Sequence, residues 1–177
     1  MKIGLYFGSF NPVHHGHLMI ASHVVNRTDV QQVWFVVSPQ NPFKQAGSLL
    51  NEYDRLHLVN LAIENDETRL RASDVEFKLP RPSYTIDTLI YLEEKYPQHE
   101  FAIVMGSDGF INIKRWKNAD ILLKKYSFYR FLFLGIMKSS TKKALHSIFQ
   151  KKIEHSKKVK TRENKIRVYT IFLVLNL

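Results

Sequence analysis

Short apolar runs alternate with segments of helical periodicity along the first two thirds of the chain. The runs KIGLYFG at 2–8, VWFVVSP at 33–39 and FAIVMG at 101–106 are rich in β-branched or aromatic residues, which is typical of buried strands. Between them, apolar residues recur at helical spacing after Gly16 and over 56–63. Strands that alternate with helices form a parallel sheet covered on both faces, so we predict an α/β fold with a doubly wound sheet.

Two further segments complete this pattern. RLRASDVEFKL at 69–79 predicts another strand, although it is more polar than the others. SYTIDTLIYLEEKY at 83–96 predicts a helix that a Ser or Thr caps and that ends before Pro97. With 177 residues, the chain has the size of a single domain with a buried core.

Polar clusters follow three of the predicted strands: GSFNPVHHGH at 8–17, SPQNPFK at 38–44 and MGSD at 105–108. In parallel α/β sheets, ligands bind beyond the carboxyl ends of the strands. We therefore expect these clusters to meet at one edge of the sheet and to form the functional site.

The first cluster has the composition of a phosphate-binding loop. Gly8 allows a sharp turn where a ligand approaches the backbone. The N–H groups of Ser9 and Phe10 can then face an anion at the start of the following helix.

The histidines of the same cluster suit this chemistry. His14 and His17 would lie on one side of the first helical turn and donate to phosphate oxygens, while Gly16 leaves room for the phosphate. Histidines near a helix start can also be merely solvated, and the HxxH spacing also occurs in metal sites. Because no nearby carboxylate completes a ligand set, we predict no metal-binding residues here.

Cysteine and apolar content restrict the function classes. The chain has no cysteine, which excludes disulfides, thiolate catalysis and Cys-type zinc sites and is compatible with the cytoplasm, where we expect the protein. No apolar run approaches the roughly 18 residues of a membrane span, and the first apolar run is interrupted too early for a signal peptide. We expect no membrane partner.

The net charge of +10 is concentrated at the C-terminal end. Residues 1–123 carry 12 Lys and Arg against 14 Asp and Glu, whereas residues 124–177 carry 14 against 2. We therefore expect a domain over 1–123, followed over 124–177 by an atypical basic and apolar tail.

The three clusters, with YDR at 53–55, RPSYTIDTL at 81–89 and the Trp of KRWKN at 114–118, resemble in type and order the motifs of bacterial nicotinate-mononucleotide adenylyltransferases. GSFNPVHHGH is similar to the (H/T)xGH element of the wider nucleotidyltransferase superfamily. The resemblance covers about residues 1–123 and implies a Rossmann-like sheet. It also implies transfer of AMP from ATP, with Mg²⁺, to the 5′-phosphate of nicotinate mononucleotide, by in-line attack without a covalent enzyme intermediate. The products would be nicotinate adenine dinucleotide, for NAD biosynthesis, and pyrophosphate.

The resemblance also implies a site. His14 and His17 would be catalytic and contact the ATP phosphates. The ATP side would further include Gly8, Ser9, Phe10, Gly16, Lys44, Gly106 and Asp108, the last accepting from a ribose hydroxyl. The mononucleotide side would consist of Ser83, Tyr84, Thr85 and Trp116, the last stacking on the pyridine ring. The nucleotide itself would supply most of the Mg²⁺ ligands.

Several of these residues also have a purely structural interpretation. Ser83 or Thr85 can cap the helix that they begin. An isolated Trp such as Trp116 is commonly a core residue. Arg55 either contacts phosphate or forms a structural ion pair.

The C-terminal third departs from the family pattern. The family has an ISSTxIR element there, whereas this chain has KSSTKKAL at 138–145, with Lys143 and Ala144 in place of Ile and Arg. We hypothesise that residues from about 124 onward are out of frame or degenerate. Coding DNA in which no other frame encodes an ISSTxIR-like ending would exclude this.

Three alternatives stay open. A nucleotide-binding remnant without the ATP-side arginine would bind mononucleotide but not turn over ATP. A related transferase of phosphopantetheine or cytidylyl groups would share the HxGH element but lack the SYTIDTL and Trp set. The basic tail could bind nucleic acid, which we do not expect because it contains no recognised module. A homo-oligomer is neither predicted nor excluded.

Overall fold

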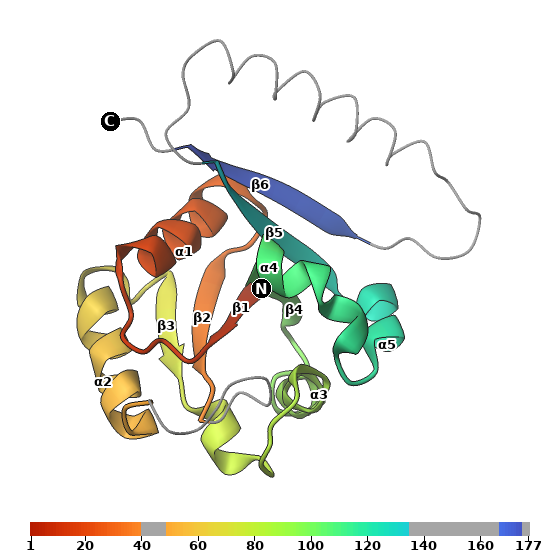
Figure 1. Cartoon of the computed structure of the whole chain (residues 1–177), viewed down its shortest axis with the longest axis horizontal. Helices are drawn as coiled ribbons and strands as arrows, with labels where there is room; N and C mark the ends of the chain where they lie inside the picture. Colours follow the sequence, from red (N-terminus) through yellow and green to blue (C-terminus); the bar gives the residue numbers. More distant parts are fainter. Residues whose placement is uncertain (40–48, 135–166, 175–177) are drawn as a thin grey trace.

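The computed structural model describes residues 1–39, 49–134 and 167–174, which form a parallel sheet with helices on both faces (Figure 1). The predicted doubly wound α/β fold is therefore confirmed. The elements are β1 (Lys2–Gly8), α1 (His15–Arg27), β2 (Gln32–Val37), α2 (Glu52–Ile63), η2 (Glu64–Asp66), β3 (Leu70–Ser73), η3 (Val75–Lys78), α3 (Thr85–Lys95), β4 (Glu100–Gly106), α4 (Ser107–Ile111), η4 (Ile113–Arg115), α5 (Ala119–Lys125), β5 (Ser127–Leu134) and β6 (Val168–Val174).

The strand order determines where a ligand can bind. The order is β3-β2-β1-β4-β5-β6, and every pair is parallel. Leu5 of β1 pairs with Trp34 of β2 on one side and with Ile103 of β4 on the other. The order reverses at β1, so a crevice opens beyond the carboxyl ends of β1 and β4.

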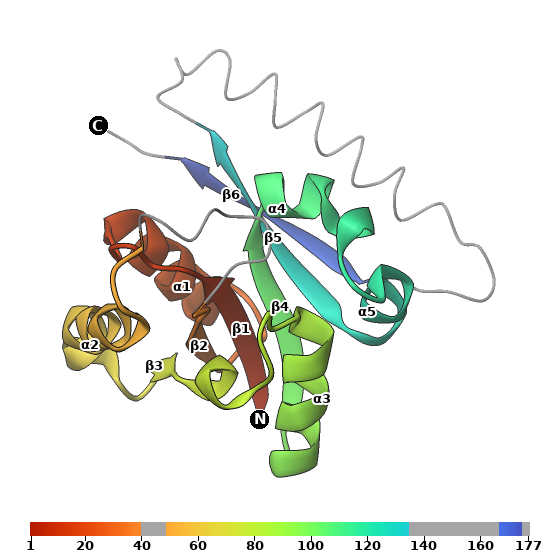
Figure 2. The same ribbon diagram turned by 60° about the horizontal axis from the view of Figure 1, so that its bottom comes forward.

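Each face of the sheet has its own core because successive side chains of a strand point to opposite faces. Tyr6 belongs to the core under α1 and α2, and Leu5 to the core under α3 and α5. Figures 1 and 2 show these two helical layers on opposite sides of the sheet. No helix in the described part of the chain is long and apolar enough to span a membrane.

The strand expected over 69–79 is wrong beyond Ser73. After β3 the chain turns into the 3-10 helix η3, in which the N–H of Phe77 donates to the carbonyl of Asp74 at 2.9 Å. This turn buries Glu76, which is 2% exposed and finds hydroxyl partners on and before α3. A continued strand would not bring its carboxyl to those hydroxyls.

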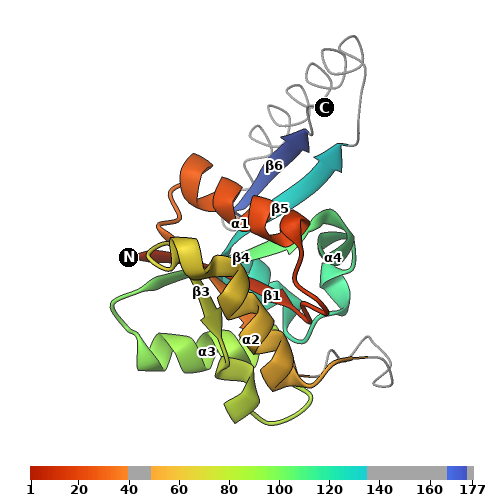
Figure 3. The same cartoon turned by 90° about the vertical axis from the view of Figure 1, so that its left-hand side faces the viewer.

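The sheet continues beyond residue 123, which lies within α5. β5 pairs with β4, and β6 pairs with β5 at the edge of the sheet (Figure 3). The rings of Tyr129 and Tyr169 stack across these two strands with centroids 4.9 Å apart. The segment beyond residue 123 thus contributes two parallel strands, β5 and β6, to the same sheet.

Candidate active site

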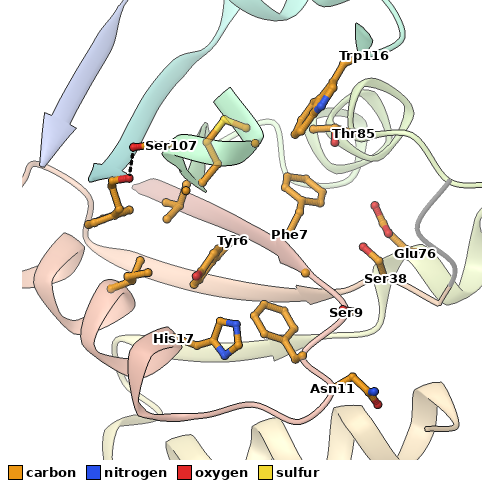
Figure 4. A pocket seen from close by; sticks show the side chains of 18 of the residues that line it. Tyr6, Phe7, Ser9, Asn11, His17, Ser38, Glu76, Thr85, Ser107 and Trp116 are labelled. Atoms are coloured by element: carbon orange, nitrogen blue, oxygen red, sulfur yellow. Dashed lines mark hydrogen bonds between the residues drawn. The ribbon is translucent and has the colours of Figure 1, made fainter. Parts of the chain in front are cut away.

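An open pocket of about 1020 Å³ lies beyond the carboxyl ends of β1 and β4, where the strand order reverses. Its walls come from opposite sides of the sheet: the loop before α1 forms one wall, and the start of α3 and the segment after η4 form the other (Figure 4). Most of the predicted site residues line it, namely Gly8, Ser9, Phe10, His14, Gly16, His17, Ser83, Tyr84, Thr85, Gly106 and Trp116. The two others are Lys44, which lies outside the described residues, and Asp108, whose side chain is not described.

The turn after β1 is made by Phe10 rather than by Gly8. Phe10 adopts a left-handed conformation with φ of 46°, whereas no glycine in the described residues has a positive φ. Its ring is 2% exposed and folds back under Gly8, where an added Cβ would lie 2.9 Å from Cζ of the ring. Gly8 is therefore needed for the space it leaves to this ring.

Phe10 in turn orients the catalytic candidate His17. The two rings meet edge to face with centroids 5.1 Å apart, and Tyr6 packs against both. The backbone N–H of His14 donates to Nδ1 of His17 at 3.2 Å. Nδ1 thus acts as an acceptor, so a neutral His17 carries its proton on Nε2, which can donate to a ligand.

The two histidines lie together at the start of α1. His14 is the N-cap residue of α1 and His17 is in the first turn, and their rings stack with centroids 3.8 Å apart. A Cβ at Gly16 would lie 3.1 Å from two atoms of the His14 ring. Gly16 therefore leaves room for the His14 ring, and the phosphate approach expected at Gly16 stays a prediction.

Arg55 holds the loops behind this wall. The side chain is fully buried and donates to the carbonyls of Leu50, Ser9, Ser38 and Pro39, at 2.5 to 3.2 Å. Burial lowers the pKa of the guanidinium, and the four carbonyls compensate for its lost hydration. Neither of the two roles expected for Arg55, phosphate contact or an ion pair, accounts for these bonds.

The opposite wall begins at the N-terminus of α3. The N-cap residue is Tyr84, without a side-chain cap, so the capping expected from Ser83 or Thr85 is not found. The hydroxyl of Ser83 instead donates to Glu76 at 2.9 Å. The first backbone N–H groups of α3 are thus left uncapped by side chains beside the pocket.

Cationic and aromatic groups complete this wall. Trp116 lines the pocket while part of it packs on the core under α3 and α5. The ammonium of Lys117 lies 4.8 Å from the ring centroid of Tyr84 and 2.8 Å from a carboxylate oxygen of Asp87. Arg115 also lines the pocket, so this wall combines half-buried aromatic rings with cationic side chains, of which Lys117 is paired with Asp87.

Glu76 is a site residue that the sequence analysis missed. Its carboxyl accepts from the hydroxyls of Ser83 and of Thr88 (3.0 Å), and the side chain of Ser38 lies beside it. Burial raises the pKa of Glu76, and these hydroxyls partly offset that effect. Within VEFKL, the only signal was a lone acidic residue between two apolar ones.

The third polar cluster lies at the end of β4. Gly106 precedes the short helix α4, and the hydroxyl of Ser107 donates to the carbonyl of Phe131 on β5. Residues 138–145 lie outside the described residues. No group of three or more His, Asp or Glu within the described ranges could hold a metal ion.

Comparisons with known proteins identify the family of this chain. The model of the cytidylyltransferase-like family matches residues 5–167. The chain is 52% identical over 129 residues to the probable nicotinate-nucleotide adenylyltransferase of Flavobacterium psychrophilum and 54% identical to that of Cytophaga hutchinsonii. These matches cover 73% of this chain and 66% and 67% of the relatives, and a 45% identical relative from Bacteroides thetaiotaomicron is covered over 61%. The matched stretch thus spans about two thirds of the length of these relatives.

Solved structures share the fold. The Plasmodium falciparum nicotinic acid mononucleotide adenylyltransferase complexed with NaAD superposes with a TM-score of 0.69 at 20% identity, over 97% of this chain and 75% of that chain. A nicotinate-nucleotide adenylyltransferase structure from Vibrio parahaemolyticus gives a TM-score of 0.61 at 22% identity, over 73% of this chain and 76% of that chain.

Proposed function

The chain belongs to the cytidylyltransferase-like family, and we propose that it transfers the adenylyl group of ATP to nicotinate mononucleotide and releases pyrophosphate. One observation carries this proposal: the histidine pair and the wall of Ser83, Tyr84, Thr85 and Trp116 face one pocket from opposite sides. A transfer between two nucleotides requires both to be held in line in one cavity.

The histidine side suits the ATP phosphates. The 5′-phosphate oxygen of the mononucleotide forms a bond to the α-phosphorus of ATP, and the bond to the departing pyrophosphate breaks. Negative charge on the phosphates increases towards the leaving group, and Nε2–H of His17, His14 and the N-terminal end of α1 can stabilise it. We also assign Lys44 to the phosphates and Asp108 to a ribose hydroxyl, as the family resemblance implies.

The opposite wall suits the pyridine nucleotide. The side-chain-uncapped N–H groups of α3 favour a carboxylate, which distinguishes a nicotinate from a nicotinamide ring. Trp116 offers an aromatic face for stacking. A divalent cation, which we take to be Mg²⁺, would enter with the ATP phosphates as part of the substrate.

A substrate panel tests this proposal. ATP or CTP is combined with nicotinate mononucleotide, nicotinamide mononucleotide or phosphopantetheine, and products are identified by mass spectrometry. We expect nicotinate adenine dinucleotide from ATP and the nicotinate nucleotide, with a smaller yield from the nicotinamide nucleotide. A cytidylyl product or adenylylated phosphopantetheine as the main product would contradict the proposal.

A further inference from the structure

A chain of polar groups joins the two walls along the pocket, with the fully buried Arg55 behind one of them. It runs from the carbonyl of Ser9 through Arg55 to the carbonyl of Ser38, whose side chain lies beside Glu76, and from Glu76 to Ser83 at the start of α3. Figure 4 shows Ser38 and Glu76 side by side between the two walls. None of these contacts follows from the transfer chemistry itself.

Ser38 is the point where this chain branches. Its carbonyl accepts from Arg55 at 2.9 Å, its N–H donates to the carbonyl of Gly8 at 2.9 Å, and its side chain lies beside Glu76. Two of these three contacts involve only backbone atoms of Ser38. The loop before α1 therefore stays anchored to Ser38 even where the contact with Glu76 is lost.

The start of α3 depends more on Glu76. In the described part of the chain, the hydroxyls of Ser83 and Thr88 donate to the two oxygens of this carboxyl. Burying a carboxyl with 2% exposure is costly unless its hydrogen bonds are made. Ser83 and Thr88 lie on either side of the first turn of α3, so one carboxyl determines where the uncapped N–H groups of that helix point.

We propose that Glu76 is a positioning residue that holds the start of α3, and with it the mononucleotide wall, in register with the phosphate loop. The proposal rests on the proposed function. Glu76 does not take part in the chemistry. It acts through Ser83 and Thr88 on the position of Thr85 and its neighbours, which would contact the mononucleotide. Its removal therefore weakens mononucleotide binding more than ATP binding.

The test compares Glu76→Ala, Glu76→Gln and the wild-type protein in steady-state kinetics with each substrate varied in turn. We expect Glu76→Ala to raise KM for nicotinate mononucleotide by about 10-fold or more, with KM for ATP changed by less than about 3-fold. Glu76→Gln should restore the mononucleotide KM to within about 3-fold of wild type, because Ser and Thr hydroxyls can both donate to and accept from an amide.

A matched control separates positioning from a general loss of stability. The hydroxyl of Thr28 also makes two hydrogen bonds, with Val24 and Val30, but Thr28 is the C-cap residue of α1 and does not line the pocket. Thr28→Val should lower the melting temperature without separating the two KM values. The positioning role is wrong if Glu76→Ala, like Thr28→Val, lowers the melting temperature without separating the two KM values. It is also wrong if Glu76→Gln raises KM for nicotinate mononucleotide as much as Glu76→Ala does.

Failure of the inference and failure of the proposed function give different results. An active wild-type enzyme without a KM split in Glu76→Ala contradicts only the inference. If the wild-type protein turns over no substrate but binds nicotinate mononucleotide in calorimetry, weaker binding by Glu76→Ala supports the inference and equal binding contradicts it. A wild-type protein that neither binds nor turns over the mononucleotide contradicts the proposed function, and the inference fails with it.

Discussion

The guanidinium of Arg55 lies 2.5 Å from the carbonyl oxygen of Ser9, although 46 residues separate the two in sequence. The same side chain bonds the carbonyls of Ser38 and Pro39 after β2. A buried cation thus joins the loops after two neighbouring strands, and one of those loops carries the histidine pair. Arg55 on α2 therefore helps to position the histidines, although no residue of α2 lines the pocket.

Replacing Arg55 by Lys should therefore cost stability although the charge is kept. An ammonium cannot reach all the carbonyls that the planar guanidinium bonds, and those left unpaired remain buried. We expect Arg55→Lys to lower the free energy of unfolding by about 2 kcal/mol in urea titrations. Arg27→Lys, an exposed control at the end of α1, should change it by less than about 0.5 kcal/mol. Equal effects of the two substitutions would contradict the role given to Arg55.

Gly16→Ala should separate stability from activity. Gly16 lies inside α1, where Ala is favoured by up to about 1 kcal/mol, and the exposed His14 ring can move away from the new Cβ. We expect an unchanged or raised melting temperature together with a kcat lowered by about 10-fold, because the His14 ring is displaced from His17. A variant with full activity would show that the stacked arrangement of the two rings is not needed.

Trp116→Phe should act on one substrate. A smaller ring stacks less well, and base–aromatic stacking contributes about 1–3 kcal/mol, so KM for nicotinate mononucleotide should rise several-fold while KM for ATP stays constant. Trp34→Phe is the matched control, since Trp34 is 3% exposed in the core and outside the pocket. It should lower the melting temperature and leave both KM values unchanged. If KM for ATP rises in parallel with KM for nicotinate mononucleotide, Trp116 acts as a core residue and does not stack on the pyridine ring.

Glu76→Gln should alter how stability depends on pH. Burial raises the pKa of Glu76 in the folded protein above its ordinary value of 4.5, so folding favours the protonated carboxyl. The stability that this preference provides is present below the ordinary pKa and is lost as the pH rises through the folded pKa. Gln cannot ionise, so the free energy of unfolding of Glu76→Gln relative to wild type should increase between about pH 4 and pH 7. Urea titrations across this range measure the difference, and one that stays constant or decreases with pH would contradict the raised pKa.

The sequence was sufficient for the first four strands of the sheet, whereas β5 and β6 lie in the segment expected to be an atypical tail. Alternating strands and helices produce a parallel sheet whose loops meet at one edge, so the clusters after β1 and β4 could be assigned to one site. The residues before α3 were assigned to that site by the family resemblance. The predicted end of the third strand was wrong because the alternation of apolar and polar residues in ASDVEFKL fits a strand as well as a turn. Only the hydroxyls of Ser83 and Thr88, distant in sequence, make the turn at Glu76 favourable.

The supporting contacts could not be predicted from the sequence. Arg55 bonds backbone carbonyls, which every residue has, so no residue type marks its partners. The left-handed turn falls on Phe10 because its ring fills the space under Gly8, a packing effect that local propensity does not contain.

The central claim is tested most directly by pyrophosphate release from the purified protein with ATP, Mg²⁺ and nicotinate mononucleotide. His17→Ala is compared with His15→Ala, an exposed neighbour on α1 that does not line the pocket. We predict release that requires all three components, falls by about 100-fold or more in His17→Ala and is retained in His15→Ala. No release from the wild-type protein, or equal release from both variants, would contradict the account.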